Sequence, residues 1–100
     1  MQLKFSRFIE SDLEDIAGFI AQDNPRRAVT FIKEIRSKFS EIQKNPLAYQ
    51  LRPDIGDEAR MTTIGNYVIL FRIIGDIIRI ERVTYGNRDL PNIPLGHPKL

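Results

Sequence analysis

ARMTTI-GN-YVILFRII-GD-IIRIERVTY, residues 59–85, contains three runs rich in β-branched and aromatic side chains, separated by Gly65-Asn66 and Gly75-Asp76. Pairs of this kind suit two-residue hairpin turns, because glycine and asparagine tolerate positive φ angles. In the middle run both alternating faces are apolar, which is typical of a central strand that is covered on one side and partly shielded on the other. The stretch therefore predicts a three-stranded antiparallel meander.

The residues before this stretch predict a strand and a helix. Apolar and polar side chains alternate imperfectly over residues 2–9, and we interpret this segment as a first strand. Ser11 and Glu14 fit a capping box, in which the serine oxygen and the glutamate each satisfy a free amide of the first helical turn. A helix is therefore expected to begin at Ser11, with an apolar stripe at helical spacing: Leu13, Ile16, Ala17 and Ile20.

A second helix is expected to start directly after the first. Asn24 can cap a helix, and Pro25 suits its first position because it lacks an amide that would have no partner there. Its apolar face runs until Asn45-Pro46, which ends it. Two helices joined by so short a turn must run antiparallel. The predicted class is α+β: an N-terminal strand, an antiparallel helical hairpin and a three-stranded antiparallel meander.

The predicted domain spans residues 1–90, and residues 91–100 form a proline-rich tail that cannot be regular structure. The pattern leaves open whether this tail is draped on the domain or loose. A loop of about a dozen residues connects the second helix to the meander, and its length suggests a functional role. No apolar run resembles a membrane span or a signal peptide, so a cytoplasmic location is expected.

Composition argues against several classes of chemistry. The 100-residue chain has no cysteine and a single histidine, His97, so thiol nucleophiles and the usual zinc ligand sets are absent. We expect neither a metal nor a cofactor. The formal net charge is only +2, so charge alone gives no argument for direct binding to nucleic acid.

The basic residues of the second half are nearly all arginines, whose planar fork pairs with carboxylates and phosphates. We interpret the candidate site as a basic and aromatic rim that grips a protein partner. Each member also has a structural explanation: a strand arginine such as Arg82 or Arg79 can pair with a carboxylate such as Glu81, and Tyr85 can be an aromatic at the edge of the core. The predicted rim comprises Arg52, Arg60, Arg82, Tyr85, Arg88 and Asp89.

Several phrases resemble the ParE branch of the RelE/ParE toxins of bacterial toxin–antitoxin pairs, over residues 3–90: NPRRAVTFI (24–32), RPDIG (52–56), GNYVILFRI (65–73) and RIERVTYGNRD (79–89). The resemblance implies a toxin that blocks DNA gyrase and is neutralised by a cognate antitoxin of the ParD type. It departs from the family pattern at Tyr85, where histidine is common, and at Arg72, where an aromatic residue is frequent.

Two other functions compete with this expectation. RelE-like toxins cut messenger RNA without a metal, and here that reaction would fall to Arg60, Arg82 and Tyr85. It needs a base and an acid, and this sequence offers few groups able to transfer a proton near neutral pH. We therefore expect no catalytic residues and favour a protein-binding inhibitor over an enzyme. The third alternative is a binding module without toxicity. The sequence does not decide between a homodimer and a hetero-oligomer with the antitoxin.

An antitoxin would bind by laying a helix in a groove or by adding a strand to a sheet edge. The expected receiving surface is the outer face of the helical hairpin together with the edge of the sheet.

Overall fold

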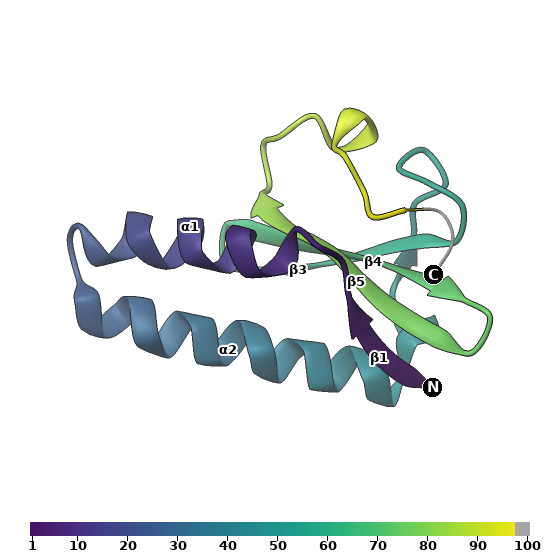
Figure 1. Cartoon of the computed structure of the whole chain (residues 1–100), viewed down its shortest axis with the longest axis horizontal. Helices are drawn as coiled ribbons and strands as arrows, with labels where there is room; N and C mark the ends of the chain where they lie inside the picture. Colours follow the sequence, from purple (N-terminus) through teal and green to yellow (C-terminus); the bar gives the residue numbers. More distant parts are fainter. Residues whose placement is uncertain (98–100) are drawn as a thin grey trace.

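The computed structural model describes residues 1–97 and places two helices against one face of a five-stranded sheet (Figure 1). The predicted α+β class, with strand, helical hairpin and meander in that order, is confirmed. The elements are β1 (Gln2–Phe5), α1 (Ile9–Ala21), α2 (Pro25–Lys44), β2 (Gln50–Leu51), β3 (Ala59–Ile64), β4 (Tyr67–Ile74) and β5 (Ile77–Tyr85), with short 3-10 turns η1 (Pro46–Ala48) and η2 (Leu90–Asn92).

The meander forms the middle of the sheet, whose strand order is β1-β5-β4-β3-β2. Both predicted hairpin turns are present, and the glycine of each has a positive φ: +56° at Gly65 and +62° at Gly75. Only glycine adopts this backbone conformation without a steric cost. β1 runs parallel to β5 at one edge, and the chain between these two strands contains both helices and strands β2 to β4. β2 lies inside the predicted loop and pairs with β3 at the other edge.

The boundary between β1 and α1 differs from the prediction. The strand ends at Phe5 and the helix begins at Ile9, so the capping box at Ser11 and Glu14 is wrong. Ser6 organises the junction instead: its hydroxyl accepts the Phe8 amide at 3.2 Å and donates to the Glu81 carbonyl at 2.6 Å. Ile9 is buried, and this burial extends the apolar stripe of α1 by one turn beyond the predicted start.

The start of α2 agrees with the prediction. The Asn24 side chain accepts a hydrogen bond from the Arg27 amide at 3.0 Å, and Pro25 occupies the first helical turn. The buried face of α2 packs with that of α1 against the sheet. This core contains Phe31, Ile35, Phe39 and Ile42 of α2, Leu13 and Ile16 of α1, and Ile69, Phe71, Ile78, Ile80 and Val83 of the sheet.

The tail covers the opposite face of the sheet. Leu90 and Ile93 are 7% and 6% exposed and pack with Val68 and Leu70 of β4. In Figure 1 this segment, coloured yellow, crosses the sheet on the side away from α2. The tail is therefore draped on the domain as far as residue 97, and the last part of the predicted tail, residues 98–100, lies outside the described residues.

No helix within residues 1–97 is long and apolar enough to cross a membrane. The same residues contain no group of three or more histidine and acidic side chains arranged to hold a metal ion.

Candidate functional site

A β-bulge in β5 positions the charged residues of the sheet. Leu70 pairs with Arg82 whereas its neighbour Phe71 pairs with Ile80, so Glu81 is an extra residue on β5. Ile80 and Val83 both pack in the core beneath the helices. The bulge therefore turns Glu81 and Arg82 away from that core, toward the face that the tail covers.

Arg82 is buried and forms a structural ion pair. Its Nε and Nη2 donate to the two carboxylate oxygens of Asp12 on α1, both at 2.9 Å, and its Nη1 donates to the Pro94 carbonyl at 3.0 Å. The guanidinium also lies 4.4 Å from the ring centre of Phe8. Both side chains of the ion pair are 9% exposed. The side chain of Arg82 is thus enclosed in the fold and does not lie on an exposed rim.

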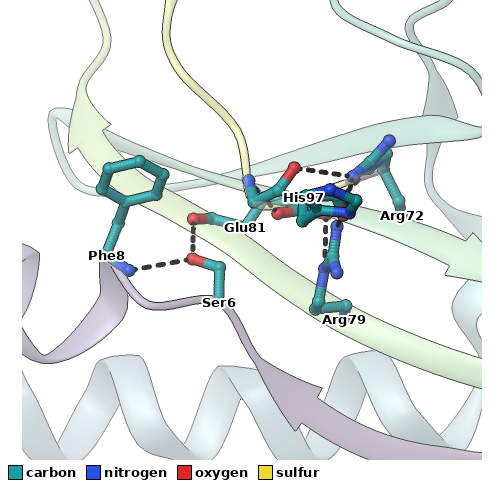
Figure 2. A network of polar contacts seen from close by, with 7 residues as sticks. Ser6, Phe8, Arg72, Arg79, Glu81 and His97 are labelled. Atoms are coloured by element: carbon teal, nitrogen blue, oxygen red, sulfur yellow. Dashed lines mark hydrogen bonds and ion pairs between the residues drawn. The ribbon is translucent and has the colours of Figure 1, made fainter. Parts of the chain in front are cut away.

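Glu81 is the centre of a second buried network (Figure 2). One carboxylate oxygen accepts hydrogen bonds from Nε of Arg72 at 2.7 Å and Nε of Arg79 at 2.9 Å, while the other accepts the Gly96 amide at 2.8 Å. Glu81 is 0% exposed. The predicted pairing of Arg79 with Glu81 is confirmed, although it is buried rather than solvated. The departure from the family pattern at Arg72 has a structural explanation, because Arg72 belongs to this network.

Arg52 and Arg60 both lie near β2, but Arg52 contacts Met61 of the tail-side cluster whereas Arg60 faces the helices. Arg52 forms a salt bridge of 2.8 Å with Asp54; this hydrogen bond lowers the pKa of Asp54 and raises that of Arg52. Arg60 donates to the Tyr49 carbonyl at 2.8 Å. Its cross-strand partner is Phe71, whose side chain faces the helices, so Arg60 shares that face.

Tyr85 and Arg88 line a hollow between α1 and the end of β5. The ring centres of Tyr85 and Tyr67 are 5.3 Å apart in an edge-to-face arrangement, and Phe19 of α1 is 64% exposed beside them. Burial raises the pKa of Tyr67, and the charge of Tyr85 raises it further by a smaller amount. An adjoining hollow shares the same three rings and is bordered by Arg27. We call this surface the aromatic hollow: Phe19, Tyr67, Tyr85, Arg27 and Arg88.

The structure divides the predicted rim into three parts. Arg52 and Arg60 lie near β2, Arg82 is buried beneath the tail, and Tyr85 and Arg88 line the aromatic hollow. Asp89 follows Arg88 and accepts a hydrogen bond from the Asn92 side chain at 2.7 Å. Tyr67 is partly buried and packs against the core.

Sequence reasoning missed Phe19 and Asp12. Phe19 widens the apolar stripe at the far end of α1, yet it is exposed beside Tyr67 and Tyr85. Asp12 belongs to a run of acidic residues at the start of α1, and its burial depends on a partner 70 residues away. No local pattern could have shown that contact.

The three residues that ribonuclease activity would require do not surround a common point. Arg60 and Tyr85 are paired with Phe71 and Tyr67, which pack on the helix side of the sheet, whereas Arg82 faces the tail. A phosphate could not contact Arg60 and Arg82 on opposite faces of one sheet. The exposed aromatic hollow, in contrast, combines apolar area with cations at its border, a composition frequent at the centres of protein interfaces.

Comparison with known proteins identifies a family. A family model described as the ParE toxin of the type II toxin–antitoxin system parDE matches residues 3–90. Among solved structures, a chain from a chromosomal ParDE TA system of P. aeruginosa is similar, with a TM-score of 0.73 and 24% sequence identity. The match covers 85% of this chain and 95% of that chain, and it shows a shared fold. A search of curated proteins found no match.

Proposed function

Because this chain belongs to the ParE toxin family of type II toxin–antitoxin systems, we propose that it inhibits DNA gyrase in the cytoplasm by binding it and is silenced by a cognate antitoxin. The observation that carries the mode of action is the aromatic hollow. Its rings are exposed or half-buried on a rigid frame, with α1 on one side and the end of β5 on the other.

The hollow suits the capture of a protein segment. Phe19 and Tyr85, 64% and 42% exposed, offer apolar area that the fold leaves uncovered. Arg88 at one border and Arg27 at the other can pair with carboxylates flanking an apolar anchor. Arg27 already pairs with Glu34 and lies 5.0 Å above the ring of Phe31, so its orientation is fixed before a partner arrives.

A groove on the outer side of the helical hairpin suits the antitoxin. Small residues on both helices, Ala17, Gly18, Ala21 and Ala28, let another chain approach closely, and Val29 and Ile32 give the groove an apolar wall. Lys33 and Arg36 border it. These features favour an amphipathic helix with apolar residues on one side and acidic residues beside them. The groove shares no lining residue with the aromatic hollow.

A supercoiling assay tests the proposal. Purified protein added to DNA gyrase should stop supercoiling of relaxed plasmid, and the cognate antitoxin should restore it. A parallel incubation with messenger RNA, with and without ribosomes, tests the ribonuclease alternative. Intact supercoiling together with cleaved transcripts would overturn the proposal, and so would harmless expression without antitoxin.

A further inference from the structure

Among residues 1–97, the buried charges beneath the tail are not balanced. Arg72 and Arg79 are direct cross-strand partners, 8% and 6% exposed, and the single carboxylate of Glu81 lies between them. Two like charges opposite each other in a sheet ordinarily destabilise it. Glu81 compensates one of them, so the pair retains an excess positive charge.

The last described residues of the tail supply the remaining acceptors. Nη2 of Arg72 donates to the carbonyls of Gly96, at 3.2 Å, and of His97, at 3.4 Å. Nη2 of Arg79 also donates to the His97 carbonyl. Two adjacent backbone oxygens thus face two guanidinium groups, in the way that two oxygens of an anion would (Figure 2). Carbonyls, however, carry only partial charge, and charge-assisted hydrogen bonds to an anion are stronger.

We infer that the Arg72–Arg79 pair is a phosphate-binding site that the tail carbonyls occupy in this conformation, and that it binds a phosphate group when residues 95–97 lift away. Guanidinium groups suit a phosphate because each can donate two parallel hydrogen bonds to its oxygens. The arginines are held in place by Glu81 through their Nε atoms, so their Nη donors stay directed toward the vacated position.

The tail can open at this end without losing its main anchor. Leu90 and Ile93 are buried in the cluster on the helix-free face, whereas Pro94 is exposed and Leu95 is only partly buried. Lifting residues 95–97 withdraws Leu95 from that cluster and breaks the hydrogen bond from the Gly96 amide to Glu81, so the closed tail is the favoured state. A site that is open in a small fraction of molecules binds with an affinity reduced by that fraction, so the closed tail should make phosphate binding weak in the wild-type chain.

A substitution at Gly96 can displace the tail without substituting either arginine. A Cβ at this position would lie 2.8 Å from the Glu81 carboxylate and 3.2 Å from the Arg79 guanidinium, so Gly96→Val in the full chain should push residues 95–97 off the sheet. Gly18→Ala is the matched control, because a Cβ at Gly18 meets nothing within 4 Å. Adding Arg72→Gln to Gly96→Val removes one of the two proposed phosphate ligands.

Pyrophosphate at constant ionic strength is the probe, measured by calorimetry beside hydrogen exchange of the amides of residues 95–97. We expect faster exchange in Gly96→Val, an affinity at least about tenfold higher than in the wild type, and loss of that gain with Arg72→Gln. The Gly18→Ala chain should behave as wild type. Faster exchange without tighter binding, or a gain that survives Arg72→Gln, would overturn the inference.

A measurement on the wild-type chain covers the case in which Gly96→Val does not fold or leaves the tail in place. Pyrophosphate should then accelerate exchange of the Gly96 amide in the wild type, since binding draws molecules into the open state; unchanged exchange at saturating probe would overturn the inference. A twelve-nucleotide RNA distinguishes the source of the phosphate. Stronger competition by RNA than by pyrophosphate identifies a polynucleotide, and the reverse order identifies a free phosphate compound. Because no gyrase is involved, failure here leaves the proposed function untouched.

Discussion

Asp12 and Arg82, 70 residues apart in the sequence, form a buried bidentate ion pair that joins α1 to β5. The same carboxylate accepts the Val83 amide at 3.0 Å. β1 ends at Phe5, opposite Ile80, so the edge of β5 beyond that point has no neighbouring strand. Asp12 takes the place of the missing strand as an acceptor, and it compensates a charge that would otherwise be buried alone.

Replacing Asp12 by asparagine should strongly destabilise the fold. The substitution leaves the Arg82 guanidinium buried without a counter-charge, and breaking such pairs costs about 3–5 kcal/mol. Urea unfolding followed by circular dichroism measures the free energy of unfolding. Asp15→Asn, an exposed acidic residue of the same helix, serves as the control and should stay within about 0.5 kcal/mol of wild type. A loss below about 1 kcal/mol in Asp12→Asn would show that the ion pair contributes little.

Tyr67 should titrate at a higher pH than a free tyrosine, because its pKa is raised in the folded state. Burial raises the pKa of Tyr67 and the neighbouring Tyr85 adds to the effect. A neutral phenol is therefore favoured in the folded state, so this contribution to stability is present below the ordinary pKa of about 10. It is lost as the pH rises through the higher folded-state pKa.

Absorbance of tyrosinate at alkaline pH measures this effect. Tyr67→Phe should remove a transition at high pH, and the free energy of unfolding should fall less steeply above about pH 10 than in the wild type. Tyr85→Phe is the complementary variant: the pKa of Tyr67 should decrease slightly, because burial is the larger cause of the shift. If the titration curve of Tyr67→Phe kept every transition of the wild type, the high-pH transition would not belong to Tyr67.

Local patterns predicted the meander and the helical hairpin because each depends on neighbouring residues. The turns at Gly65 and Gly75 need a positive φ, and Asn24-Pro25 supplies both the cap and the first position of α2. The predicted start of α1 was wrong, since Ser6 organises the junction through a hydrogen bond to a carbonyl of β5 that is 75 residues away in the sequence. The expected position of Arg82 on an exposed rim was wrong for a similar reason. A period of two places Arg82 on one face of a regular strand, and only the bulge at Glu81, invisible in the pattern, directs it to the tail.

Filling the hairpin groove should uncouple toxicity from its control. Gly18 lines the groove and a Cβ there meets nothing within 4 Å, so Gly18→Phe adds bulk at the surface without disturbing the core. The substitution should therefore prevent the antitoxin helix from binding in the groove and leave the stability of the fold unchanged. Co-expression with the antitoxin should then fail to restore growth, while inhibition of gyrase by the purified variant stays unchanged. Full rescue of Gly18→Phe by the antitoxin would place its binding surface elsewhere.

Truncating the aromatic hollow should weaken inhibition of gyrase without unfolding the chain. Phe19 and Tyr85 are 64% and 42% exposed and neither belongs to the core cluster, so Phe19→Ala with Tyr85→Ala removes little core packing. Central aromatic residues of an interface often contribute about 2 kcal/mol or more each. The concentration needed to stop supercoiling should therefore rise by about 30-fold if the two losses overlap fully and by about 700-fold if they add.

The matched control is Leu47→Ala, which truncates an apolar side chain of equal exposure, 65%, on η1. Antitoxin binding by the double variant, measured by calorimetry, should equal that of the wild type because the hairpin groove is intact. Arg88→Gln should show a smaller loss that shrinks further at high salt, since an exposed cation at the border of an interface acts mainly through screened attraction. If the double variant inhibited gyrase as well as Leu47→Ala, the hollow would not be the surface that contacts gyrase.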